Sequence, residues 1–203
     1  MNRNKKSICT IILIVINVVV FFALSFIGQT EDGEFMLRFG ASYTPYVIEN
    51  KEYYRLFTSM FLHFGFQHLA NNMVMLGFVG WNVEAEAGKV RFLIIYLLSG
   101  LIGNIVSTIW DLRTVTDGGY AVSAGASGAV YGIIGCALGI ALLNKGRIGN
   151  LSQRGLIIMI LLGIYYGATA GNIDNAAHIG GLVSGFLLTL IIYRRQKTVR
   201  SDY

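Results

Sequence analysis

The sequence predicts an all-α protein that lies in a membrane as a bundle of six transmembrane helices. Hydrophobic residues make up 54% of the 203 residues and charged residues only 13%, whereas soluble domains average roughly 45–50% and about 25%. The apolar residues gather into six stretches close to the roughly 20 residues that a helix needs to cross a bilayer. A chain of this length suits one domain. We therefore expect a single membrane domain over residues 1–203.

The six predicted spans cover residues 8–27, 61–83, 92–109, 127–143, 155–171 and 176–193. The first follows three basic residues, but its apolar run exceeds the roughly 7–15 residues of a signal peptide, so we interpret it as a retained span. The second is the most polar, because it carries two histidines and an asparagine. The fifth contains Gly163, Gly167 and Gly171, which leaves open a five-span arrangement with a re-entrant fifth segment.

The Lys and Arg residues fall mostly on one side of the predicted membrane. With the N-terminus inside, 12 of the 16 lie in inner segments, namely Arg3, Lys5, Lys6, Lys89, Arg91, Lys145, Arg147, Arg154, Arg194, Arg195, Lys197 and Arg200. The outer set is Arg38, Lys51, Arg55 and Arg113. We therefore expect both termini to lie in the cytoplasm. We expect the membrane to be the plasma membrane. The net charge of +5 then reflects this bias and attraction to anionic lipids, so no nucleic-acid partner is expected.

The outer segment 28–60 is too aromatic for a free linker and contains the only proline, Pro45. We expect it to lie at the membrane interface as short amphipathic helices.

The polar residues of the spans fall at one depth. His63 and His68 begin the second span, Ser127 begins the fourth and His178 begins the sixth, so all are placed near the outer face. Ionisable groups inside a bilayer are costly and usually mark function. A serine hydroxyl becomes a good nucleophile when a neutral histidine takes its proton, so the sequence points to nucleophilic catalysis within the lipid layer.

Helical spacing indicates how these residues would meet. His68 and Asn72 share a helix face, as do Ser127 and Tyr131. Small residues form one stripe at positions 124, 128, 132 and 136 and another at 177, 181 and 185. Such stripes let helices approach closely in lipid, and packing the two together would bring His178 within reach of Ser127.

Acyl transfer also needs donors for the oxyanion. The Asn72 amide, the His68 ring and the Ser127 backbone N–H can supply them, and Gly125 and Gly128 would let the substrate backbone approach Ser127. The run Gly125–Ala129 is not the hydrolase elbow G-x-S-x-G, because position 129 is Ala and no strand precedes it.

Together these motifs resemble those of the rhomboid intramembrane serine proteases. The resemblance rests on His63-x4-His68-x3-Asn72, on Gly125-Ala-Ser127-Gly128 with Tyr131, and on Ala177-His178-x2-Gly181, and it extends over about residues 50–190. It implies the minimal six-helix rhomboid form and cleavage of transmembrane protein substrates near the extracytoplasmic side of the bilayer.

The resemblance also implies individual roles. Ser127 and His178 would form the catalytic dyad, His68, Asn72 and the Ser127 backbone the oxyanion hole, and Tyr131 would stack on the His178 ring. His63 would be supporting, and Glu84 would hold a loop. The family's Trp-Arg pair in the outer segment is Tyr54-Arg55 here. No cofactor is expected.

Three alternatives remain at this stage. Asp174, four residues before His178, could act as a triad acid, although a residue of a short outer loop would more simply face water. The three histidines could hold a metal, but no HExxH motif is present. The chain could also be a catalytically inactive rhomboid-like binder of membrane proteins, a class expected to lose the Ser or His that this chain keeps.

Overall fold

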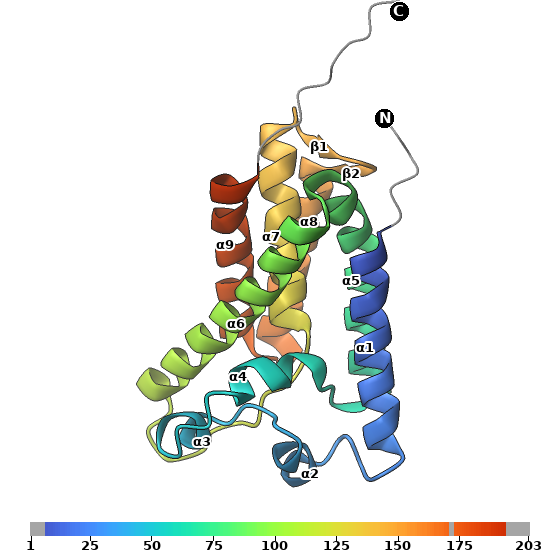
Figure 1. Ribbon diagram of the computed structural model, residues 1–203. Coiled ribbons are helices and arrows are strands. Elements are labelled where there is room, and N and C mark those ends of the chain that lie inside the picture. Colours follow the sequence, from blue (N-terminus) through green and yellow to red (C-terminus); the bar gives the residue numbers. More distant parts are fainter. Residues whose placement is uncertain (1–6, 171–172, 194–203) are drawn as a thin grey trace, which may run out of the picture.

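A computed structural model describes residues 7–170 and 173–193 and shows an α-helix over each of the six apolar stretches (Figure 1). These helices are α1 (Ile8–Ser25), α5 (Gly65–Ala87), α6 (Lys89–Thr114), α7 (Ser127–Leu143), α8 (Gln153–Ala170) and α9 (Asn175–Ile192). Four of them, α1, α6, α8 and α9, are long and apolar enough to cross a membrane. The helix α8 is continuous over its 18 residues, which does not favour a re-entrant fifth segment.

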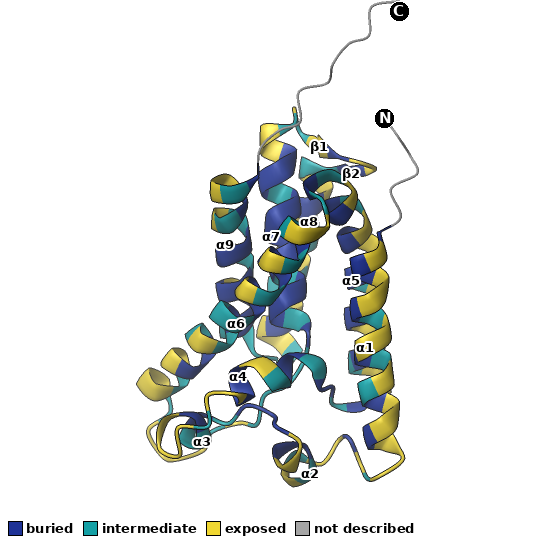
Figure 2. Cartoon of the chain, viewed as in Figure 1, coloured by how far each residue is buried: buried dark blue, intermediate teal, exposed yellow. Residues whose placement is uncertain are grey.

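The helix α7 lies at the centre of the bundle and packs against α5, α6, α8 and α9 (Figure 2). It is rich in glycine and alanine, and most of its residues are buried. Without long side chains, its neighbours can pack against its backbone on several sides. The most apolar helix, α1, instead exposes one whole face, as expected for a helix that contacts lipid.

The outer segment folds into the short helices α2 (Gly33–Arg38), α3 (Thr44–Ile48) and α4 (Arg55–Thr58) and the 3-10 turn η1 (Ser59–Phe61). Arg55 holds this segment together. Its Nη1 donates to the carbonyl oxygens of Leu37 and Ala41 at 2.7 and 3.0 Å, and its Nε bonds Glu52 at 2.6 Å. The expected short helices are therefore present, organised around an arginine that is 6% exposed.

The described residues form an all-helical fold with one short strand pair, which the sequence analysis does not predict. Strands β1 (Arg147–Ile148) and β2 (Leu151–Ser152) form an antiparallel hairpin between α7 and α8. The two residues between them, Gly149 and Asn150, are a common hairpin turn pair, and Gly149 has the positive φ of 53° that such a turn needs.

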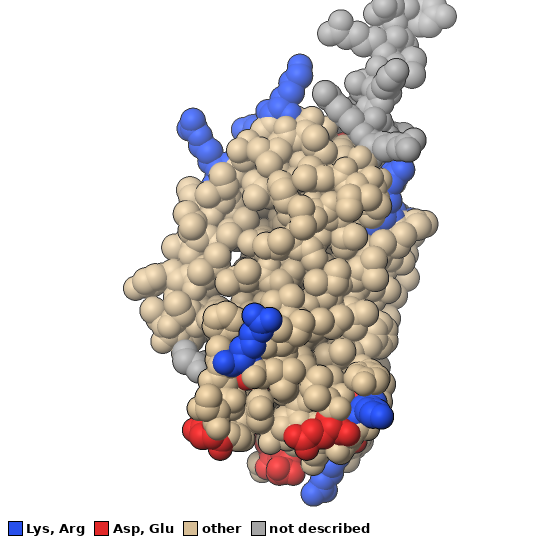
Figure 3. Space-filling view, turned by 90° about the vertical axis from the view of Figure 1, so that its left-hand side faces the viewer, with Lys and Arg blue, Asp and Glu red and all other residues tan. Residues whose placement is uncertain are grey.

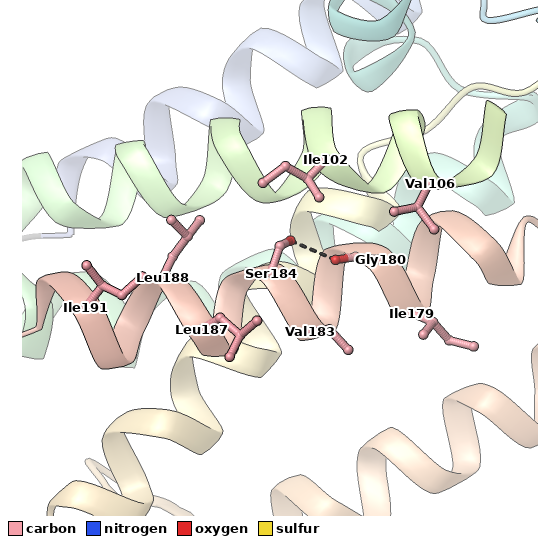
Figure 4. A pocket seen from close by; sticks show the side chains of 9 residues that line it. All are labelled: Ile102, Val106, Ile179, Gly180, Val183, Ser184, Leu187, Leu188 and Ile191. Carbon is pink, nitrogen blue, oxygen red and sulfur yellow. Dashed lines mark hydrogen bonds between the residues drawn. The ribbon is translucent and has the colours of Figure 1, made fainter. Parts of the chain in front are cut away.

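The surface separates into charged ends and an uncharged middle. On the face shown in Figure 3 the acidic residues gather at one end, and the stretch between the ends is almost free of charge. An open apolar groove of about 500 Å³ runs between α6 and α9. The one hydroxyl beside it, that of Ser184, donates to the carbonyl oxygen of Gly180 at 2.7 Å (Figure 4), so the groove offers lipid an apolar surface.

Candidate active site

Ser127 is the first residue of α7, and the segment before it is tied to the outer segment. Ser123 and Ser42 exchange two backbone hydrogen bonds of 2.8 Å. Gly125 N donates to the carbonyl oxygen of Ser59 at 2.9 Å. No side chain caps α7, so the N–H groups of its first turn, which have no partner within the helix, remain available at Ser127.

His178 lies in the first turn of α9 and is 8% exposed. Its ring stacks on that of Tyr131, with 4.2 Å between ring centroids and 14° between planes. Tyr131 is one turn beyond Ser127 on α7, so the stack places the imidazole beside the first turn of that helix. Within the described residues, His178 Nδ1 is buried and has no hydrogen-bond partner.

Glycines bring α7 and α9 into backbone contact. A Cβ atom on Gly181 would collide with the carbonyl oxygen of Gly128, and one on Gly185 with that of Gly132. The predicted pairing of small-residue stripes is therefore present, except that position 124 precedes α7. Within the described part of the chain, no hydrogen bond joins Ser127 to His178. Such bonds often tighten only when substrate is bound.

Gly125 and His68 meet beside Ser127. Gly125 has φ +145°, and a Cβ placed on it would lie 2.7 Å from His68 Cε1, 2.9 Å from His68 Nε2 and 3.7 Å from Ser127 Oγ. The His68 ring and the Ser127 hydroxyl therefore border the same point. The prediction that Gly125 lets a substrate backbone approach Ser127 stays a prediction, and the structure adds that its missing side chain makes room for the His68 ring.

Asn72 is buried one turn after His68 on α5. Its Nδ2 donates to the carbonyl oxygen of His68 at 2.9 Å. An amide nitrogen carries two hydrogens, so one remains for another acceptor.

His63 does not lie on a helix, contrary to the sequence-based expectation, because α5 begins only at Gly65. Its ring is 1% exposed. It contacts His68, with ring centroids 5.2 Å apart, and its Nε2 accepts from Ala126 N at 3.4 Å. His63 thus contacts the residue directly before Ser127.

The family model of the Rhomboid domain matches residues 50–195. The chain belongs to the rhomboid family. It is 36% identical over 184 residues to rhomboid protease GluP of Bacillus subtilis, an alignment that covers 91% of this chain and 34% of GluP. It is 33% identical over 150 residues to YdcA of Bacillus subtilis, provisionally named a rhomboid protease, covering 74% of this chain and 72% of YdcA.

RHOMBOID-like protein 7 of Arabidopsis thaliana is 35% identical over 147 residues, which cover 72% of this chain and 45% of that protein. The chain thus spans about a third of the length of GluP and about half that of the plant relative. Its rhomboid domain and its apolar helices make it a multi-pass membrane protein.

Sequence reasoning missed several polar contacts of this rhomboid domain. Asn104 of α6 donates from Nδ2 to the carbonyl oxygen of Leu56 at 2.7 Å and to Ser59 Oγ at 3.1 Å. Ser59 in turn holds Gly125. The signal was an asparagine within an apolar stretch, which is costly unless it is bonded. Glu84 accepts from the backbone nitrogens of Cys9 and Thr10 at 2.9 and 2.7 Å; it holds the start of α1, not a loop.

Proposed function

We propose that this chain is an intramembrane serine endopeptidase that cleaves transmembrane segments of membrane proteins, with Ser127 as nucleophile and His178 as general base. The observation that carries this proposal is the His178–Tyr131 stack beside the first turn of α7, where Ser127 begins the helix. Membership of a family that includes a protein named rhomboid protease supports it.

In the proposed reaction, a neutral His178 takes the proton of the Ser127 hydroxyl as the oxygen attacks the scissile carbonyl carbon. The histidine then gives that proton to the leaving amine, and an acyl-enzyme remains on Ser127. Water, deprotonated by His178, hydrolyses it. The Tyr131 ring keeps the imidazole plane fixed, which a triad carboxylate does in soluble serine proteases.

The negative charge on the carbonyl oxygen needs donors that are already in place. The backbone N–H groups of the first turn of α7 belong to the residues that begin with Ser127, and the His68 ring borders the same point as the Ser127 hydroxyl. The Asn72 amide lies one turn after His68 and has a second hydrogen that the His68 carbonyl oxygen does not take. We assign these groups to the oxyanion hole. Three residues support them: His63 accepts from Ala126 N, Gly125 makes room for the His68 ring, and the carbonyl oxygen of Gly128 touches Gly181 of α9.

We further propose that six helices cross the bilayer, with both termini in the cytoplasm of a plasma-membrane protein and the active site near the outer face. The partners in this proposal are the lipid bilayer and single-span proteins whose helices unwind near the outer end. Of the basic inner residues that favour this orientation, Lys89, Arg91, Lys145, Arg147 and Arg154 lie in the described part of the chain. The rest, at positions 1–6 and 194–203, lie outside it.

The test is proteolysis of a helical substrate in detergent and in vesicles. Ser127→Ala and His178→Ala should each abolish cleavage, and Ser127→Ala should also abolish labelling by a fluorophosphonate. Ser25→Ala, which alters another serine within a helix, should cleave at the wild-type rate. Wild-type turnover in either dyad variant would disprove the assignment. A correctly folded wild-type chain that neither cleaves nor labels would disprove the enzymatic proposal, and co-purification of a membrane protein with it would then favour the inactive binder.

A further inference from the structure

The carboxylate of Asp174 contacts three separate donors just outside the proposed dyad. Oδ2 accepts from the hydroxyls of Ser107 at 2.6 Å and Ser123 at 2.9 Å. Oδ1 accepts from Ala177 N at 2.9 Å and caps α9. The expectation that this side chain would simply face water was therefore wrong.

These three donors belong to different parts of the site. Ser107 lies on α6, Ser123 lies four residues before Ser127, and Ala177 directly precedes His178. The carbonyl oxygen of Asp174 also accepts from His178 N at 3.2 Å. A single residue thus links the helix that carries the base, the segment that leads to the nucleophile, and a third helix that packs against both.

The glycine contacts between α7 and α9 do not by themselves fix how the two helices are rotated or shifted against each other. Backbone packing through small residues is close but not directional, so it resists separation of the helices better than sliding or rotation. Hydrogen bonds depend on both distance and angle, and those to a carboxylate are among the stronger ones. Bonds from Asp174 to Ser123 and to the first turn of α9 fix the position that packing leaves adjustable.

We propose that Asp174 is a positioning residue that sets the placement of His178 relative to Ser127, an inference that rests on the proposed function. It acts through the backbone of α9 and the Ser123 hydroxyl. It does not act as the third member of a triad, because both carboxylate oxygens are bonded elsewhere and His178 Nδ1 has no partner among the described residues.

Two substitutions at Asp174 separate its capping of α9 from its bonds to Ser107 and Ser123. Asp174→Ser keeps a side chain that caps helices well but is too short to reach Ser107 and Ser123. Asp174→Asn keeps both the length and the cap, and the two hydroxyls can rotate to accept from its amide. A misplacement of about 1 Å can cost roughly 100-fold in rate. We therefore expect Asp174→Ser to lower kcat at least ~10-fold with KM nearly unchanged, and Asp174→Asn to recover most of the rate.

The rate of fluorophosphonate labelling of Ser127 reports on the dyad without a membrane substrate. It should fall in Asp174→Ser by the same factor as kcat. Ser123→Ala removes one of the contacts without altering α9, so it should slow labelling in part. The double variant should label no more slowly than Asp174→Ser alone, because the two changes break the same contact. If Asp174→Ser does not fold, the Ser123→Ala result decides.

Thr44→Val is the matched control. Thr44 Oγ1 donates to Asp111 Oδ2 at 2.7 Å, which is also a hydroxyl–carboxylate bond onto α6 but does not involve α9. It should label at the wild-type rate. Wild-type kcat and labelling in Asp174→Ser and Ser123→Ala, or a loss confined to thermal stability or KM, would overturn the positioning role while leaving the dyad intact. Absence of labelling in the wild-type chain would instead overturn the proposed function and this inference together.

Discussion

At the candidate site, the position of the His68 side chain depends on a single glycine. Gly125 combines a φ of +145° with a hydrogen bond to Ser59 and contact with the His68 ring. The backbone there therefore determines where His68 lies relative to the Ser127 hydroxyl.

Gly125→Ala should lower kcat/KM by at least ~10-fold, because its Cβ would be only 2.7 Å from His68 Cε1 and small displacements of catalytic groups are costly. Steady-state cleavage of a helical substrate measures this. Gly77→Ala is the control, since its Cβ would meet only Ile14 Cδ1 at 3.7 Å. Equal rates in the two variants would contradict the role given to Gly125.

His68→Ala and Asn72→Ala test the oxyanion assignment. Both should lower kcat more than they raise KM, because the donors act chiefly on the transition state. The loss should be roughly 10- to 1000-fold in each variant, as at soluble oxyanion holes. If both variants changed KM alone, these residues would belong to substrate binding.

Among the helices, the contact between α7 and α9 is the one on which the proposed dyad depends. Gly181 and Gly185 each face a carbonyl oxygen of α7, so the site forms where two helix backbones touch. The helix α8 is attached more loosely, because only 17% of its 18 residues are buried in the protein, against 39% of those of α9.

Gly185→Ala should destabilise the α7–α9 pair by about 1–3 kcal/mol, the usual cost of overpacking a tight core. Its Cβ would lie 2.6 Å from Gly132 Cα. Thermal unfolding in detergent measures the loss, and Ser184→Ala, one residue away, should change the midpoint much less. An unchanged midpoint for Gly185→Ala would mean that the helices can separate without cost.

Loose attachment of α8 suggests that substrates reach the site from lipid between α5 and α8. Gly163 and Gly167 of α8 accommodate the Tyr131 and Asn175 side chains, whereas Gly171 lies outside the described residues. On the α5 side, Phe66 is 62% exposed.

A cross-link between α5 and α8 tests this route. Two cysteines placed at the outer ends of these helices, in a variant that lacks Cys9 and Cys136, should block cleavage of a membrane-spanning substrate when they are linked. Reducing a cleavable linker should restore it. Full activity of the linked protein would exclude this route.

Across the molecule, the charged residues of the described segments concentrate at the two ends of the helix bundle (Figure 3). The acidic residues of the outer segment lie at the end that holds the candidate site (Figures 1 and 3). The hairpin β1–β2 lies at the other end, with Arg147 in β1 and Lys145 two residues before it. The uncharged stretch between them is the surface expected to face lipid.

Single cysteines should report this orientation in intact cells. Position 34, in the outer segment, should react with a membrane-impermeant thiol reagent, whereas position 150, in the hairpin, should react only after the cells are lysed. Both residues are exposed in the structure, so accessibility within the protein does not bias the comparison. The reverse pattern would invert the proposed topology.

Where the helices lie, and which residues are candidates for chemistry, could be predicted from the sequence. Long apolar stretches leave the backbone no alternative to helices in lipid, and polar residues are too costly there to occur without a reason. Ser127, His178, His68 and Asn72 could therefore be named before any contact was known. The pair Gly149–Asn150 is also a local signal, because such pairs are common in hairpin turns.

Which of these groups meet depends on how the helices pack in three dimensions. The tertiary structure placed His63 outside the helix, turned one Asn72 hydrogen to the His68 carbonyl oxygen, and directed the Asp174 carboxylate to Ser107 and Ser123. Periodicity fixes the face of a helix on which a residue lies, but not the depth or rotation of that helix against its neighbours. Those depend on close contacts between residues far apart in the chain, such as Gly185 with Gly132, which no local pattern encodes.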